Sequence, residues 1–139
     1  SDPTLNNKDR LIVEKVSYYF RAPKPGDIVV IKYPANPKEK FIKRVVAVGG
    51  DKVKIENGKL YINDVAKNEP YILETMATGD FNEVTVPDNT VFVLGDNRNN
   101  SRDSRFSDVG YVNYKLVVGR AAFRIYPFNR MGTLSSAHK

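Results

Sequence analysis

The most constraining feature of the sequence is a central segment, residues 52–62, in which apolar and polar residues alternate on both sides of Asn57-Gly58. Asn-Gly fits the two-residue type I′ turn of a β-hairpin, because both positions tolerate positive φ. A hairpin on this turn places two apolar pairs opposite each other on one face: Ile55 with Leu60, and Val53 with Ile62. The segment therefore predicts antiparallel β structure.

Other short segments are rich in valine, isoleucine and aromatic residues, and each is bounded by proline, glycine or asparagine, which predicts further strands. These segments are residues 11–18, 27–33, 41–48, 83–86, 90–94 and 119–126. The prolines between residues 20 and 40 favour loops and sheet edges there. We expect a single all-β, mainly antiparallel domain over residues 1–139, arranged as a two-sheet sandwich or a partly closed barrel.

The residue types that are missing exclude several kinds of chemistry. The chain has no cysteine, and its single histidine, His138, is next to last. This composition excludes disulfides and cysteine nucleophiles, and it argues against a Ser-His-Asp triad or a histidine-rich metal site. A hydrolase of this composition needs a lysine or a carboxylate as its base. We expect no metal and no cofactor.

The net charge and the hydropathy concern partners and location. A formal charge of +6 favours an anionic neighbour, either nucleic acid or an anionic membrane surface, and charge alone leaves both open. No window approaches the roughly 18 consecutive apolar residues that a membrane span requires. We therefore expect the chain to be soluble by itself.

Lys43 lies within the predicted strand at residues 41–48. Alternation puts Phe41, Lys43, Val45 and Ala47 on one face, and Ile42, Arg44, Val46 and Val48 on the other. Both faces are thus largely apolar with one cation each. The Lys43 stem could lie along apolar surface with its amine in water. Alternatively, the amine could be desolvated, with a lowered pKa that lets it accept a proton. The strand pattern leaves both interpretations open.

A polar loop, Gly95-Asp-Asn-Arg-Asn-Asn-Ser101-Arg-Asp-Ser-Arg105, follows the predicted strand at residues 90–94. Such a composition needs no explanation beyond a tight surface turn. However, arginines, aspartates and serines alternate in it, which predicts a network of charge-assisted hydrogen bonds that fixes the loop. Fixed polar loops on rigid sheets are common places for functional sites.

The ordered motifs of the chain resemble the successive motif boxes of bacterial type I signal peptidases. They are Asp2-Pro-Thr-Leu5, Asp9-Arg-Leu-Ile-Val13, Gly26-Asp-Ile-Val-Val30, Ile42-Lys-Arg-Val-Val46, Gly50-Asp51, the loop Gly95–Arg105, and Val118-Gly-Arg-Ala-Ala-Phe-Arg-Ile-Tyr-Pro127. The resemblance covers nearly the whole chain. It implies two antiparallel sheets and an endopeptidase that removes signal peptides from secreted pre-proteins, with a serine nucleophile and a lysine general base.

The resemblance also implies roles for individual residues. Lys43 takes the position of the general base, and Ser101 that of the serine whose hydroxyl orients the lysine. Three residues take the positions of supporting ion pairs: Arg44, Asp103 and Arg105. Three more fall where the family builds shallow pockets for the small residues before the cut: Leu5, Phe41 and Ile42. Arg98 receives no role in proton transfer, although it belongs to the same loop.

The amino terminus departs from the family pattern. The family motif reads Ser-Met-x-Pro-Thr, whereas Pro3 is preceded here only by Ser1 and Asp2. The resemblance therefore places the nucleophilic serine and a membrane anchor just upstream of Ser1, and we do not assign the nucleophile to Ser1. It follows that this chain alone should be inactive, and that the intact protein should be anchored at the outer face of the bacterial cytoplasmic membrane.

Two other functions compete with this interpretation. A basic β-barrel that binds nucleic acid would account for the charge and for the eight tyrosines and seven phenylalanines, but not for the loop Gly95–Arg105. A self-cleaving regulator with serine/lysine chemistry fits the ordered motifs less well, and no DNA-binding helix pair is evident. The partners we expect are signal peptides and an anionic membrane surface, and not nucleic acid.

Overall fold

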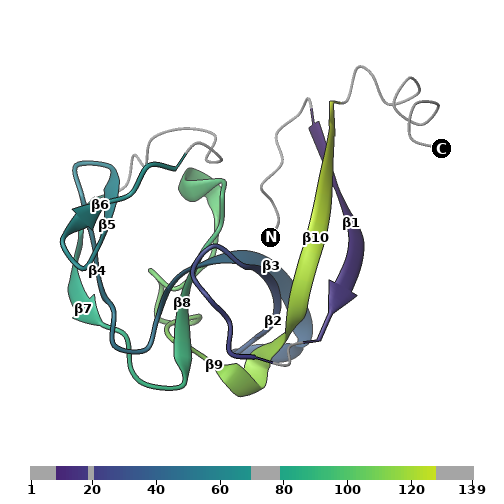
Figure 1. Cartoon of the computed structure of the whole chain (residues 1–139), viewed down its shortest axis with the longest axis horizontal. Coiled ribbons are helices and arrows are strands. Elements are labelled where there is room, and N and C mark those ends of the chain that lie inside the picture. The colour runs from purple at the N-terminus through teal and green to yellow at the C-terminus, as the bar shows by residue number, and fades with distance from the viewer. Residues whose placement is uncertain (1–8, 19–20, 70–78, 128–139) are drawn as a thin grey trace.

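The structure is a computed structural model that describes residues 9–18, 21–69 and 79–127 (Figure 1). The described part of the chain consists of strands joined by turns, with two short 3-10 helices. The elements are β1 (Asp9–Ser17), β2 (Ile28–Tyr33), β3 (Asn36–Val48), β4 (Lys52–Glu56), β5 (Lys59–Ile62), β6 (Val65–Ala66), β7 (Phe81–Thr85), β8 (Thr90–Leu94), η1 (Arg98–Asn100), β9 (Val112–Asn113), η2 (Tyr114–Leu116) and β10 (Val117–Pro127). The prediction of an all-β fold is confirmed.

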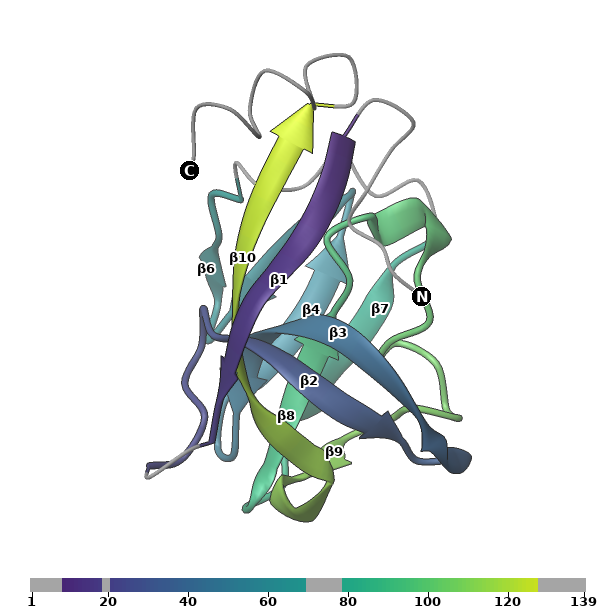
Figure 2. The same cartoon turned by 90° about the vertical axis from the view of Figure 1, so that its right-hand side faces the viewer.

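The strands form two sheets in which every neighbouring pair is antiparallel. One sheet has the strand order β1-β10-β2-β3-β8-β9, and the other has the order β6-β5-β4-β7. Figure 1 shows the smaller sheet on the left, β1 with β10 on the right, and β2 with β3 between them, and Figure 2 shows β2 and β3 running across the view. The predicted two-sheet arrangement is thus confirmed.

Two clusters of apolar side chains hold the sheets together. The first joins the smaller sheet to one face of β3 and β8, and its buried members are Val46, Ala47, Val53, Ile55, Leu60, Ile62, Val86, Phe92 and Leu94. The second covers the opposite face of β2, β3 and β8, and its buried members are Val29, Ile31, Val45, Val91, Val93, Val109 and Val112. Strand β8 and the second half of β3, from Lys43 onward, are therefore covered on both faces, which makes the backbone that carries Lys43 rigid.

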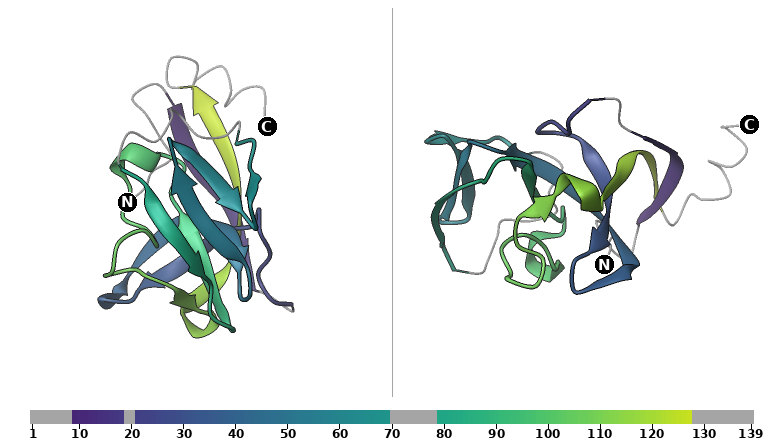
Figure 3. Two further views of the ribbon diagram at one scale, coloured as in Figure 1. Left: turned by 90° about the vertical axis from the view of Figure 1, so that its left-hand side faces the viewer. Right: turned by 90° about the horizontal axis from the view of Figure 1, so that it is seen from below.

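The central hairpin has the predicted register. Val53 pairs with Ile62 and Ile55 with Leu60. The turn residues Asn57 and Gly58 have φ angles of 52° and 78°, as a type I′ turn requires. The left view of Figure 3 shows this sheet from its outer side.

Strand β3 is longer than predicted, since it begins at Asn36 rather than Phe41. Residues 36–40 pair with the end of β2, where Lys32 lies opposite Lys40 and Tyr33 opposite Asn36. On its other side, β3 pairs with β8 only from Arg44 onward. Among the described residues, Pro37 therefore lies in a part of β3 that has a strand partner on one side only, where proline is tolerated. Of the loops and sheet edges expected between residues 20 and 40, the structure has a sheet edge at residues 36–40.

An irregularity in β3 corrects the predicted alternation. The pairing of β3 with β8 shifts between Val45 and Ala47. Such a bulge reverses which side chains face which side. Ala47 consequently joins Val46 in the first cluster, whereas Val48 packs against the second with Val45. The predicted faces for Ala47 and Val48 were therefore wrong, whereas Phe41 and Val45 share a cluster as predicted.

Within the described ranges, no helix is long and apolar enough to span a bilayer.

Candidate active site

The side chains of Lys43 and Ser101 meet at the edge of the second apolar cluster. Lys43 lies in β3 opposite Val29 of β2, and only 3% of its surface is exposed. Its Nζ donates a hydrogen bond of 2.9 Å to Ser101 Oγ, 58 residues along the chain. The contact predicted between these side chains is therefore present. Of the two interpretations left open for Lys43, burial of the amine is the one observed.

Burial lowers the pKa of the Lys43 amine to about 8, because a charged amine loses hydration in this site. The carboxylates of Asp103 and Asp96 act in the opposite direction, and the Arg105 guanidinium adds to the lowering. The Phe41 ring lies 5.2 Å from Nζ on the same strand. With such a pKa, roughly a tenth of the amine is neutral at pH 7, compared with well under a thousandth for an ordinary lysine.

Gly95 provides the space in which this contact forms. A Cβ atom at this position would lie 2.0 Å from Ser101 Oγ and 3.5 Å from Lys43 Nζ. Only a residue without a side chain fits there. From the sequence, Gly95 was predicted only as part of the polar loop, without this role. A glycine where a buried strand enters a polar loop was the available signal.

The loop after Gly95 folds back along β8. Ser104 N donates to Val93 O at 3.0 Å, and Val93 N donates to Ser104 Oγ at 2.8 Å. These two bonds fix the part of the loop that directly follows Ser101. Ser101 is therefore carried by a segment that is attached to the sheet on both sides.

Asp103 and Arg105 form a buried two-point ion pair beside the lysine. The Arg105 Nε and Nη2 atoms each donate to an Asp103 carboxylate oxygen at 2.8 Å. Asp103 is fully buried, and it also accepts a 3.0 Å bond from Gly95 N. The pair thus holds the backbone of Gly95 as well as the loop.

Arg44 and Asp96 form a second two-point pair. Arg44 Nε and Nη2 donate to the Asp96 carboxylate at 2.9 and 2.7 Å. Arg44 lies next to Lys43 in β3 and pairs with Leu94, at the end of β8. This ion pair therefore connects the strand of the lysine with the start of the loop that carries Ser101. All three residues predicted as structural support make such contacts.

Arg98 is the residue that sequence reasoning most underestimated. It is 1% exposed, and it makes a two-point ion pair with Glu69 at 2.9 and 2.8 Å. Its Nε also donates to Gly95 O at 2.7 Å. An arginine in a polar loop gives no sequence signal of burial, since its partner lies 29 residues away. Arg98 therefore supports the loop of the site, although the sequence assigned it no role, and an Arg98 variant is unsuitable as an inert control.

The residues predicted to bind substrate are only partly within the structure. Phe41 and Ile42 directly precede Lys43 in β3, and both are half-buried. The Phe41 ring packs against that of Tyr33 at 4.7 Å. Leu5 lies outside the described residues, as does the segment around Pro3.

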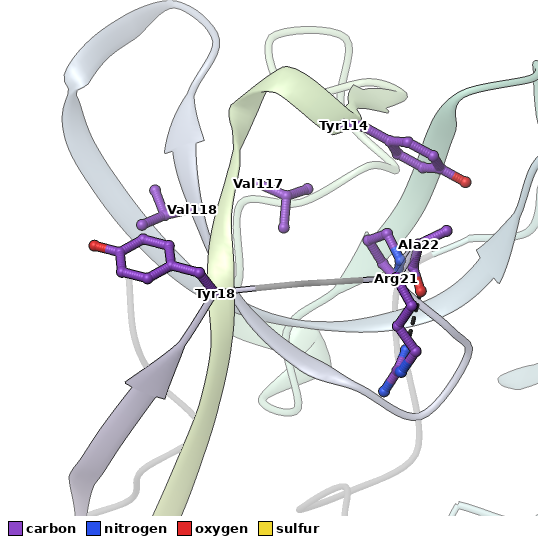
Figure 4. Close-up of a pocket in the computed structure, with 7 residues that line it drawn as sticks. Tyr18, Arg21, Ala22, Tyr114, Val117 and Val118 are labelled. Carbon is purple, nitrogen blue, oxygen red and sulfur yellow. Dashed lines mark hydrogen bonds between the residues drawn. The ribbon is translucent and has the colours of Figure 1, made fainter.

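A surface pocket of about 540 Å³ lies elsewhere, lined by residues that include Tyr18, Arg21 and Tyr114 (Figure 4). None of the predicted site residues lines this pocket. Across the described ranges, no group of three or more histidine or carboxylate side chains could hold a metal ion.

The fold and the site together define a class of protein: an antiparallel β-domain in which a buried lysine is hydrogen-bonded to a serine. The chain belongs to the family described as signal peptidase, peptidase S26, whose model matches residues 1–126. It is 43% identical to the probable signal peptidase I-1 of Synechocystis over 96% of this chain and 70% of that protein. It is 42% identical to the thylakoidal processing peptidase 1 of Arabidopsis thaliana chloroplasts over 90% of this chain, but this spans only 39% of that protein.

The fold comparison agrees with the sequence comparison. The crystal structure of a signal peptidase I from Enterococcus faecalis V583 superposes with a TM-score of 0.65 and 31% identity, covering 75% of this chain and all of that one. The predicted family and the predicted class of enzyme, a signal peptidase, are therefore confirmed. This membership does not favour the alternative of a nucleic-acid-binding module.

Proposed function

We propose that this chain is the catalytic domain of an enzyme that removes signal peptides from pre-proteins by serine/lysine acyl-enzyme hydrolysis. The observation that carries the mechanism is the buried Lys43 amine, with a pKa of about 8 and a 2.9 Å bond to Ser101 Oγ. A base with a pKa near the working pH is both available as the free amine and strong enough to take a proton. The chemistry then needs no histidine.

In this mechanism, neutral Lys43 takes the proton of the nucleophilic serine while the serine oxygen attacks the carbonyl carbon of the scissile bond. The protonated amine then gives that proton to the leaving amine, and the C–N bond breaks to leave an acyl-enzyme. Lys43 next takes a proton from water, whose oxygen attacks the ester carbon. The bond from that carbon to the serine oxygen breaks and releases the signal peptide, and the protonated amine returns its proton to the serine oxygen. In this proposal the nucleophile is the serine of the family motif that ends in Pro-Thr, matched here by Pro3-Thr4.

Ser101 orients the base in this proposal and does not accept the proton itself. Its Oγ receives the Nζ hydrogen bond, which directs the lone pair of the neutral amine. The Asp103–Arg105 and Arg44–Asp96 pairs support the two segments that meet at this contact. Their two-point geometry restricts the rotation of both arginines, so the loop keeps a fixed position relative to β3.

We place the substrate as an extended peptide beside β3. Among the described residues, β3 has no strand partner on the β8 side before Arg44, so its backbone there is open to pairing. In this proposal, Phe41 and Ile42 contact the small residues at the first and third positions before the cut, whereas Leu5, which was predicted for the same role, lies outside the described residues. The +6 charge favours contact with anionic headgroups at the extracytoplasmic face of a bacterial cytoplasmic membrane.

The test is the cleavage of a signal-peptide substrate by the full-length protein and its variants. Lys43→Ala should abolish cleavage while the protein stays folded by circular dichroism, and Ser101→Ala should reduce the rate less severely. The wild-type rate should fall as the pH drops below about 8, because the amine becomes protonated. Exposed Lys59 in β5 is the matched control, and Lys59→Ala should cleave normally. Near-normal activity of folded Lys43→Ala would rule out the serine/lysine mechanism.

A further inference from the structure

The buried pair of Glu69 and Arg98 connects the smaller sheet to the loop that carries Ser101. Glu69 follows β6, and its segment is held against β5 by a bond of 2.9 Å from Lys67 N to Leu60 O. The Arg98 side chain is fully buried and that of Glu69 is 4% exposed. Both guanidinium Nη atoms donate to the Glu69 carboxylate. The Glu69 side chain thus connects the smaller sheet to the loop of the active site.

Arg98 passes this connection on to Gly95. Its Nε donates to Gly95 O at 2.7 Å, while Gly95 N donates to Asp103 at 3.0 Å. Arg105, paired with Asp103, closes the ring by donating to Arg98 O at 2.7 Å. The backbone of Gly95 is therefore held at its N–H and at its carbonyl. This is the residue whose Cα faces the contact between the lysine and the serine.

Stability alone gives little reason for such a pair. A buried ion pair often stabilises a fold no better than apolar side chains of similar volume, because both charges lose their hydration. What apolar side chains cannot supply is the two-point orientation of the guanidinium plane, which directs Arg98 Nε at the Gly95 carbonyl. The geometry of the pair therefore contributes more to fixing the position of Gly95 than to raising the free energy of unfolding.

We infer that Glu69 is a positioning residue of the peptidase, which acts through Arg98 and Gly95 to set the contact between Lys43 and Ser101. This inference rests on the proposed function. Without the carboxylate, the Arg98 side chain loses its fixed orientation and Gly95 loses a restraint. The loop then loosens, water reaches the Lys43 amine, and the pKa of that amine rises, since burial is what lowers it.

The experiment measures kcat, KM, the pH profile and urea unfolding of the full-length protein. Glu69→Gln keeps the shape but removes the charge, and we expect kcat to fall about tenfold or more with KM changed by less than about twofold. Glu69→Asp keeps the charge and should recover part of the lost kcat. Exposed Glu83 in β7 provides the matched control, since Glu83→Gln should behave as wild type.

The double variant Glu69→Leu with Arg98→Met separates positioning from stability. It removes one positive and one negative charge side by side, so their direct effects on Lys43 largely cancel. We expect the urea midpoint of the double variant to lie close to that of the wild type. Its kcat should stay low, and the acidic limb of its kcat profile should lie at higher pH than in the wild type. A stable double variant with wild-type kcat and pH profile overturns the positioning role. Unchanged kcat in Glu69→Gln overturns it as well, whether or not the double variant folds.

Lys43→Ala in the same assay distinguishes this inference from the function on which it rests. If Lys43→Ala is inactive and the Glu69 variants are unimpaired, only the positioning role fails. If Lys43→Ala retains activity, the serine/lysine mechanism fails and the positioning role fails with it.

Discussion

A lysine becomes a useful base only where the surroundings oppose its charge more than they support it. At Lys43, two carboxylates support the charge, and burial together with the Arg105 guanidinium opposes it. Burial has the largest effect, so the pKa falls to about 8. Both carboxylates are themselves engaged by arginines, Asp103 by Arg105 and Asp96 by Arg44. This engagement leaves less of their charge to raise the pKa of the lysine.

The space beside this amine makes Gly95 a sensitive position. In Gly95→Ala, the new methyl group would overlap Ser101 Oγ, so the loop must move and the hydrogen bond to Lys43 must lengthen or break. We expect signal-peptide cleavage to fall about a hundredfold, as for a displacement of about 1 Å in an active site. Gly79→Ala is the control, because a Cβ there meets nothing within 4 Å. Equal cleavage rates for the two variants would contradict the role of Gly95.

At the scale of elements, local patterns predicted more than long-range ones. The hairpin around Asn57-Gly58 has the predicted register because its turn and its alternation both lie within a few residues. The bulge in β3 and the strand pairing of residues 36–40 depend on where β8 and β2 begin and end, and no local pattern encodes that. Two-residue strands such as β9 are likewise set by their neighbours.

The active site likewise contains residues that could be predicted from the sequence and residues that could not. Lys43 and Ser101 could be named in advance because the resemblance to the signal peptidase motifs implied them, although 58 residues separate them. The partnership of Arg98 with Glu69 could not be predicted, since a buried arginine and a solvated one look alike in sequence. Burial arises from the way the loop Gly95–Arg105 folds against the segment after β6, and only the tertiary structure shows it.

For the molecule as a whole, the active lysine costs stability. Below pH 8, folding must bury a charged amine, and a shift from 10.5 to about 8 corresponds to about 3 kcal/mol. Between pH 8 and 10.5, folded Lys43 has lost its proton while the unfolded chain still binds one, so the free energy of unfolding rises with pH. Above pH 10.5 the cost is gone.

Lys43→Met tests this cost. At pH 7 the variant should be more stable than wild type by up to about 3 kcal/mol, less what the lost bond to Ser101 contributed. The gap between the two proteins should narrow steadily from pH 8 to pH 10.5. Urea unfolding of both proteins at each pH measures it, and other titrating groups cancel in the difference. A gap that does not change with pH would show that Lys43 titrates normally in the folded chain.

The fold itself prepares Lys43 as a base, and the pKa of its amine is the most direct test of this preparation. NMR titration of the ¹³Cε resonance in lysine-labelled protein gives this pKa, with the resonance assigned by its absence from Lys43→Met. We predict a titration midpoint at about pH 8. A midpoint near 10.5, the ordinary value for a lysine, would contradict it.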